Sequence, residues 1–203
     1  MPNWCSNTIT ITGDKGNIRR IKDMMDSIEN KSESNLFQTL VGIPDYMTEG
    51  EYQEKWYDTN VTNWGTKWDV SYDDACPQFS DEEIVLSPDT AWSPPIGFGA
   101  QLAKLYQVDV ELYYTEPGCD FCGKTTCDKD GGINEEDYDY CEGLFYFDRE
   151  YFWTEMESQA EYFIAENEHT LEQFLETFPY VDKDELTEFY NEQKEYYGKE
   201  AEG

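Results

Sequence analysis

The feature that most constrains this chain is its excess of negative charge. Forty-five aspartates and glutamates stand against 14 lysines and arginines, which gives a net charge of −31 over 203 residues. Residues 111–203 hold 27 of these acids and 6 of the bases. A fold must therefore offset repulsion among its own side chains. Such a surface repels nucleic acids and anionic membranes, and it attracts basic proteins.

Aromatic residues make up 16% of the chain, which favours a folded protein despite the charge. No apolar run reaches the roughly 20 residues of a membrane span. The first residues also lack the basic and then apolar pattern of a secretory signal. We therefore expect a cytoplasmic protein that binds neither nucleic acid nor membranes directly. Its six cysteines are expected to be reduced thiols or metal ligands.

Strand and helix patterns alternate in the first part of the chain. Residues 7–12 alternate polar and apolar side chains, which predicts a strand with Ile9 and Ile11 on one face. A helix is predicted from Asp14, its cap, to about residue 28. Residues 30–62 are expected to be irregular. The other predictions are strands at 36–43, 64–70, 83–86 and 108–114, and a helix that begins at Ser93 and Pro94.

The order strand, helix, strand occurs twice, which is typical of the ferredoxin-like split βαβ sandwich in the α+β class. After residue 140, apolar residues recur at helical spacing between acidic ones, and Thr170 and Gln173 resemble a capping box at the start of one such helix. We therefore predict a ferredoxin-like domain over residues 1–145. An acidic region of two or three helices over residues 146–203 is predicted to pack on it.

Three tryptophan-containing motifs occur in order: Met-Pro-Asn-Trp-Cys-Ser-Asn at 1–7, Trp-Gly-Thr-Lys-Trp-Asp at 64–69 and Thr-Ala-Trp-Ser-Pro-Pro at 90–95. With the Glu-Pro-Gly turn at 116–118, they resemble the YubB/Api-type family of phage and plasmid proteins. The resemblance covers roughly residues 1–125. It implies a ferredoxin-like domain, a mobile-element origin and a bacterial host cell. It supplies no catalytic residues, because the family has no established activity to carry over.

Four cysteines are candidate metal ligands. Cys119, Cys122 and Cys127 follow a predicted strand, and Cys141 comes 14 residues later. Four thiolates can hold one tetrahedral zinc ion, whose role here would be structural. The histidine of a zinc knuckle is absent from this spacing, so ordinary thiols are the alternative interpretation. No other cofactor is expected.

No catalytic arrangement stands out. Forty-five acids produce close carboxylate pairs by chance, and His169 is the only histidine, with no nucleophile nearby in the sequence. Trp64, Trp68 and Trp92 are expected in or near the core. As a stacking platform for bases they would need basic neighbours, and Lys67 stands nearly alone beside them.

The C-terminal segment repeats a carboxylate every three or four residues. These residues are Asp182, Glu185, Glu188, Glu192 and Glu195. The spacing predicts one row along a helix, opposite Leu186, Phe189 and Tyr190, with a carboxylate about every 5 Å. A second acidic segment contributes Glu135, Glu136, Asp137 and Asp139.

These patterns lead to three hypotheses. In the first, the chain is a non-enzymatic acidic decoy that binds and blocks a basic, nucleic-acid-binding host protein such as a defence factor. In the second, aromatic residues between 138 and 153 form the binding surface and the acids serve only solubility. In the third, carboxylates and a divalent metal ion form an enzyme site. The charge of residues 111–203 favours the first hypothesis.

Overall fold

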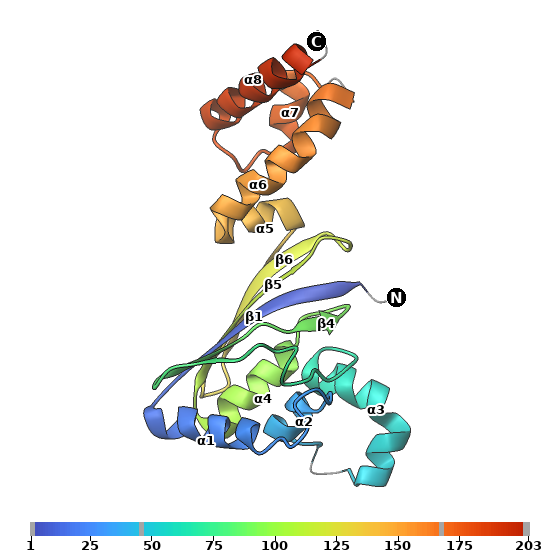
Figure 1. Ribbon diagram of the computed structural model, residues 1–203, viewed down its shortest axis with the longest axis vertical. Helices are drawn as coiled ribbons and strands as arrows, with labels where there is room; N and C mark the ends of the chain where they lie inside the picture. Colours follow the sequence, from blue (N-terminus) through green and yellow to red (C-terminus); the bar gives the residue numbers. More distant parts are fainter. Residues whose placement is uncertain (1–2, 45–46, 167–168, 201–203) are drawn as a thin grey trace. The chain divides into compact units, whose positions relative to one another are not determined.

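Seven strands pair into one antiparallel sheet in the spatial order β2-β3-β1-β5-β6-β7, and β4 pairs with the first residues of β1. This computed structural model describes residues 3–44, 47–166 and 169–200. The strands all belong to a unit that spans Met1–Tyr138, and the second unit, Asp139–Gly203, is built from helices (Figure 1). We call them the sheet unit and the helical unit. Their boundary falls before the one predicted at residue 145.

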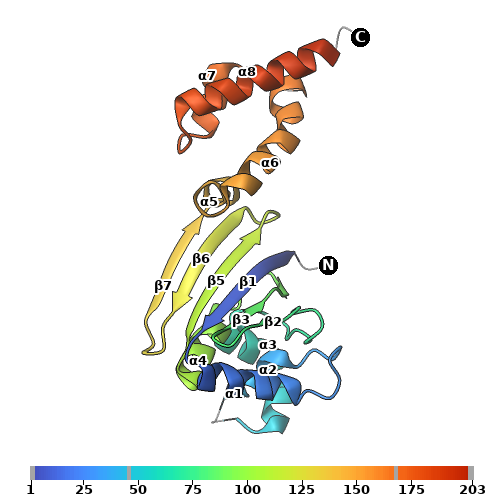
Figure 2. The same cartoon turned by 60° about the vertical axis from the view of Figure 1, so that its left-hand side comes forward.

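The central strand is β1 (Trp4–Thr12), because it pairs with strands on both sides. It runs antiparallel to β5 (Asp109–Glu116) and to β3 (Glu83–Leu86). Ile9 and Ile11 are fully buried on one face, as predicted. Figure 2 shows β1, β5, β6 and β7 side by side. The remaining strands are β2 (Gln78–Phe79), β4 (Asp89–Ala91), β6 (Phe121–Cys127) and β7 (Ile133–Tyr138).

Helices cover one face of the sheet. Helices α1 (Lys15–Asp26) and α4 (Ile96–Tyr106) confirm the two predicted helices, and Figure 1 shows both on the same side of the strands. Their predicted caps were wrong in detail: the Asp14 side chain makes no capping hydrogen bond, and α4 begins two residues later than predicted, after Pro95. Because β3 and β5 are both antiparallel to β1, they are parallel to each other, and α4 connects them as a split βαβ unit. The apolar layer between sheet and helices includes Ile9, Ile11, Ile21, Met25, Phe98 and Leu112.

Two helices occupy the segment predicted to be irregular. They are α2 (Leu36–Val41), where a strand was the prediction, and α3 (Glu49–Trp64). A capping box starts α3. The Thr48 hydroxyl accepts a hydrogen bond from the backbone N–H of Glu51 (3.3 Å), and the Glu51 carboxylate accepts one from the backbone N–H of Thr48 (2.9 Å). The buried face of α3 includes the polar residue Thr59. The helix therefore has no continuous apolar stripe by which the sequence would reveal it.

Residues 64–70 do not form the predicted strand. Trp64 is the last residue of α3, and Gly65 follows with a φ of 89°, the left-handed conformation that favours glycine at helix ends. A Cβ atom at Gly65 would lie 3.0 Å from the carbonyl oxygen of Pro94. The chain then continues as a loop to Val70.

Two hairpins complete the sheet. The predicted turn at 116–118 connects β5 to β6. The second hairpin, β6 to β7, was not predicted, because β7 has acidic residues on both faces and no apolar alternation. Asp128 holds its turn, since Oδ1 accepts hydrogen bonds from the backbone N–H groups of Asp130 (2.9 Å) and Gly132 (2.8 Å).

The helical unit confirms the predicted helices of the C-terminal third. Its α7 begins with the predicted capping box of Thr170 and Gln173. No helix in the described part of the chain is long and apolar enough to cross a membrane. The helices are α5 (Tyr140–Phe147), α6 (Arg149–Ala160) with a π-helical continuation (Glu161–Glu166), α7 (Leu171–Thr177) and α8 (Lys183–Glu200).

Aromatic rings build the core of the helical unit. Phe152 and Phe174 are fully buried. The ring centroid of Phe174 lies 5.2 Å from that of Phe178 and 5.5 Å from that of Tyr190. The Tyr190 hydroxyl also donates a hydrogen bond to the backbone oxygen of His169 (2.7 Å), so the lone histidine lies at a helix boundary.

Replacing Gly97 should destabilise the sheet unit. A Cβ atom there would overlap the backbone carbonyl of Asn63 and lie 3.1 Å from the carbonyl carbon of Trp64, where α4 crosses the end of α3. We expect Gly97→Ala to lower the free energy of unfolding by about 1–3 kcal/mol. Gly50→Ala is the matched control, because nothing lies within 4 Å of its Cβ position. Urea unfolding measures both, and equal effects would contradict this packing.

Candidate functional site

The predicted acidic row lies along α8, and its first two members form contacts within the helical unit. Asp182 Oδ1 accepts hydrogen bonds from the backbone N–H groups of Asp184 (3.0 Å) and Glu185 (3.2 Å), so it caps α8. Glu185 is half-buried, and its Oε2 lies 2.5 Å from Nη2 of Arg149. Neither carboxylate is fully available to a partner.

The other three members, Glu188, Glu192 and Glu195, are exposed. The row flanks the apolar face of α8, contrary to the prediction that it lies opposite. At about 100° per residue, the buried Phe189 falls between Asp182 and Glu185 around the helix axis. The exposed row is therefore shorter than predicted.

The second acidic segment does not form one row. Glu135, Glu136 and Asp137 lie on the edge strand β7, where successive side chains point to opposite faces. The Asp137 carboxylate accepts a hydrogen bond from the Tyr114 hydroxyl (2.5 Å). Asp139 precedes α5 in the helical unit.

Strand β6 does not bring the predicted zinc ligands together. Cys122 and Cys127 lie five residues apart on this strand, so they point to opposite faces and their Cα atoms are about 16 Å apart. Zinc–sulfur bonds are about 2.3 Å long. Cys119 is exposed in the preceding turn, and Cys141 lies in α5. In the part of the chain that the structure describes, no group of three or more His, Cys, Asp or Glu side chains can hold a metal ion.

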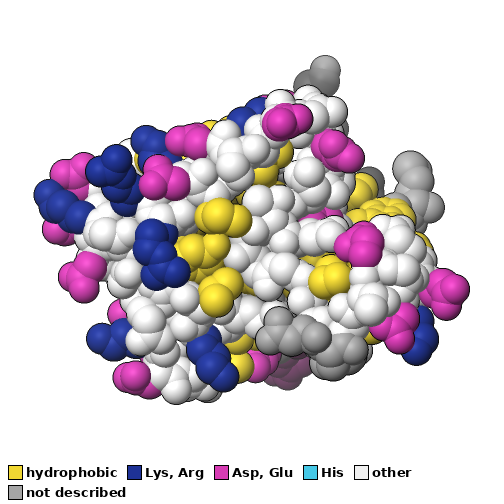
Figure 3. All heavy atoms as spheres, turned by 90° about the horizontal axis from the view of Figure 1, so that it is seen from below, with side chains coloured by type: hydrophobic (Ala, Val, Ile, Leu, Met, Phe, Trp, Pro, Cys, Tyr) yellow, Lys and Arg dark blue, Asp and Glu magenta, His cyan; other side chains and the backbone are white. Residues whose placement is uncertain are grey.

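Negative charge is concentrated in the helical unit. Its 65 residues include 19 acids and 4 bases, whereas residues 1–138 include 26 acids and 10 bases. The excess of acids per residue is therefore about twice as high in the helical unit. Several bases of the sheet unit stand on α1, and Figure 3 shows Lys and Arg side chains gathered over that part of the surface.

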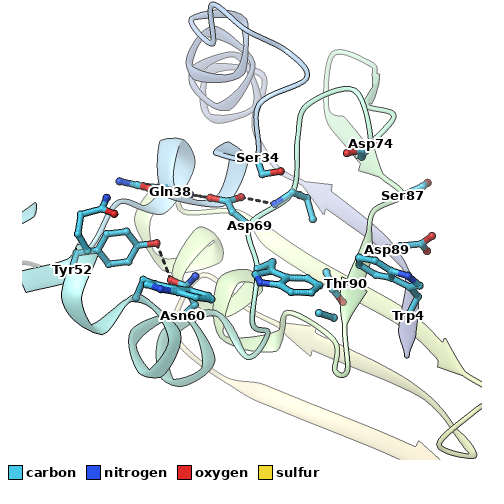
Figure 4. Close-up of a pocket in the computed structure, with 15 residues that line it drawn as sticks. Trp4, Ser34, Gln38, Tyr52, Asn60, Asp69, Asp74, Ser87, Asp89 and Thr90 are labelled. Atoms are coloured by element: carbon cyan, nitrogen blue, oxygen red, sulfur yellow. Dashed lines mark hydrogen bonds between the residues drawn. The ribbon is translucent and has the colours of Figure 1, made fainter. Parts of the chain in front are cut away.

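A pocket of about 820 Å³ lies at the edge of the sheet unit, between β4, the start of β1, the loop after Gly65, and helices α2 and α3. Figure 4 shows Asp69 beside Gln38 of α2, and Trp4 beside Asp89 of β4. We call it the aromatic–carboxylate pocket. Its lining includes Trp4, Trp56, Trp68, Asp69, Asp74 and Asp89.

Asp69 ties the pocket loop to α2. Its Oδ1 accepts hydrogen bonds from the backbone N–H groups of Phe37 and Val70 (both 2.7 Å), and its Oδ2 accepts one from Gln38 (2.9 Å). Asn35, the residue before α2, makes no capping hydrogen bond with its side chain, so Asp69 caps the helix from a distant loop. Burial raises the pKa of the Asp69 carboxyl to about 6, although the three hydrogen bonds favour its ionised form.

Three tryptophan rings line the pocket and remain accessible. Trp4 is 50% exposed, and Trp56 and Trp68 are each 37% exposed. The ring centroids of Trp4 and Trp68 lie 6.0 Å apart. The Nζ of Lys67 lies 4.6 Å from the ring centroid of Trp68. An open aromatic surface next to carboxylates suits a ligand that is flat, positively charged or both.

The sequence does not reveal this pocket. Of the tryptophans expected in or near the core, Trp64 is buried, whereas Trp68 and Trp92 are exposed. The three rings of the pocket come from β1, α3 and a loop, so no local pattern unites them. The only sign of the pocket in the sequence is that Trp68 and Asp69 are adjacent.

The sequence model of the family described as "Ferredoxin-like domain in Api92-like protein" matches residues 48–158, more than half of the chain. The chain belongs to this family. The match confirms the family resemblance and the ferredoxin-like fold of the α+β class. Among solved structures, the chain is similar to the crystal structure of protein api92 from Yersinia pseudotuberculosis. Identity is 10% and the TM-score is 0.41, over 68% of this chain and 98% of that one. No curated protein matches.

Replacing Asp69 should change how stability depends on pH. Because the pKa of its carboxyl is about 6 in the folded chain and 3.8 is the ordinary value, ionisation of Asp69 lowers stability as pH rises toward 6. The amide of Asp69→Asn does not titrate, and it caps α2 less well at every pH. The stability advantage of the wild-type chain over this variant should therefore shrink by about 1 kcal/mol between pH 5 and pH 7. Urea unfolding at several pH values measures it, and a constant or growing advantage would contradict this account.

Proposed function

We propose that the chain binds a basic, nucleic-acid-binding protein of a bacterial host through its helical unit and blocks that protein's nucleic-acid surface. It acts without catalysis and in the cytoplasm, as expected of a phage or plasmid protein. The observation that carries this proposal is the density of acids on the helical unit, 19 against 4 bases in 65 residues. Uncompensated charge at this density attracts a basic surface over a long range.

The exposed carboxylates on α8 support this proposal, because their spacing is of the same order as the spacing of charges along nucleic acid. Glu188 and Glu192 are exposed and one helical turn apart, which gives a carboxylate about every 5–6 Å. One strand of duplex DNA presents a charge about every 3.4 Å along its axis. Glu185 is paired with Arg149, but the unit has only 4 bases for its 19 acids. Most of the acids there are thus not neutralised by bases of the same unit.

The aromatic hypothesis is supported by fewer exposed residues than the sequence suggests. Phe152 is fully buried, and the ring centroid of Trp153 lies 5.2 Å from that of the buried Phe189, so part of the aromatic segment is core. Tyr146 and Tyr151 remain about half exposed. Replacing these two tyrosines therefore distinguishes the aromatic hypothesis from the acidic one. The enzyme hypothesis has no supporting arrangement among the described residues.

Reversing two charges on α8 should weaken partner binding. The full chain is immobilised and exposed to bacterial lysate, and retained proteins are identified by mass spectrometry. We expect nucleic-acid-binding proteins that elute as salt rises and that duplex DNA displaces. Glu188→Lys combined with Glu192→Lys should raise the Kd of a retained protein about tenfold, since it replaces two attractions with two repulsions.

The matched control is Glu29→Lys combined with Glu33→Lys, which makes the same change in net charge at exposed positions of the sheet unit. It should leave binding nearly unchanged. The proposal is wrong if retention resists both salt and DNA. It is also wrong if Tyr146→Ala with Tyr151→Ala abolishes retention while the α8 variant does not.

A further inference from the structure

We propose that the aromatic–carboxylate pocket binds the guanidinium group of an arginine side chain presented by a basic partner protein. The choice of a protein partner rests on the proposed function, whereas the preference for a flat cation rests on the pocket itself. A volume of about 820 Å³ accommodates an arginine side chain together with its neighbouring backbone.

Indole rings form walls on which a guanidinium can stack. The rings of Trp4, Trp56 and Trp68 are 37–50% exposed, so they are accessible in this structure. Guanidinium groups stack on such rings and are attracted by their negative faces. The Nζ of Lys67, 4.6 Å from the centroid of Trp68, shows that this ring already attracts a cation of the chain itself.

Carboxylates give the pocket a negative charge. Asp74 accepts a hydrogen bond from the Ser71 hydroxyl (2.6 Å), and Asp89 accepts one from the Ser6 hydroxyl (2.8 Å). A carboxylate accepts about four hydrogen bonds, so both acids can still accept from a ligand. No lysine or arginine is found among the described residues that line the pocket. Lys67, over the Trp68 ring, is outnumbered by the three aspartates of the lining, so a ligand cation still gains from their negative charge.

This combination favours arginine over other ligands. A sugar ring also stacks on tryptophan and its hydroxyls can donate hydrogen bonds to carboxylates, but a neutral sugar lacks the attraction between opposite charges. A lysine ammonium gains from the charge, but it is not flat and cannot stack as well. Guanidinium does both, because its planar fork can stack on an indole and donate two parallel hydrogen bonds to one carboxylate.

The test is an NMR titration of the nitrogen-15-labelled full chain, in which each tryptophan indole N–H gives its own signal. The probe is N-acetyl-argininamide, and its neutral isostere N-acetyl-citrullinamide is the control. We expect the signals of Trp4, Trp56 and Trp68 to shift with a Kd of about 1 mM. Citrulline should bind at least tenfold more weakly. The signal of Trp153, in the helical unit, should not move.

Matched variants locate the site. Trp56→Leu should weaken arginine binding about tenfold, whereas Trp92→Leu, an exposed tryptophan outside the lining, should not. The Glu188→Lys and Glu192→Lys variant separates the two proposals, because it should lose the captured partner and keep arginine binding. The inference is overturned if arginine and citrulline shift the signals equally, if an acetylated lysine amide or a disaccharide binds more tightly, or if the pocket signals do not respond up to the solubility limit of the probe.

Discussion

Repulsion between like charges is the constraint on which the rest of this structure depends. The helical unit keeps 19 acids against 4 bases within 65 residues, so its bases can neutralise only a small share of its acids. Attraction between charges therefore cannot hold the unit together. The aromatic core that includes Phe152 and Phe174 has that role, because each fully buried aromatic side chain removes a large apolar surface from water. The outcome is a unit with an aromatic core and a large excess of acids over bases.

In the sheet unit, apolar residues of the sheet and the hydrogen bonds of one buried carboxylate position the aromatic–carboxylate pocket. The apolar residues of β1 fix the register of the sheet, and Asp69 joins the loop of Trp68 to α2 through three backbone hydrogen bonds. The buried carboxyl of Asp69 has a raised pKa, so ionising it costs stability near neutral pH. This destabilising carboxyl lies in the lining of the pocket, together with the exposed tryptophan rings. Strained or costly groups of this kind often occur at functional sites.

Sequence patterns predicted the parts of the fold that depend on local apolar periodicity. The alternation around Ile9 located β1, and the capping box at Thr170 located α7. The patterns missed α3, because its capping box at Thr48 precedes a face that is not an apolar stripe, and they missed β7, because its register depends on pairing with β6. The acidic row was predictable as a spacing. The pairing of Glu185 with Arg149 depends on a contact that only the folded chain shows.

The most direct test of this balance is the thermal unfolding of the full chain as sodium chloride is raised from about 0.01 M to about 0.3 M. If uncompensated repulsion dominates the electrostatics, screening it stabilises the fold, and the Tm should rise steadily over this range. A Tm that stays constant or falls would mean that attractive ion pairs neutralise the surface. In that case the chain would not carry the open negative charge on which the account relies.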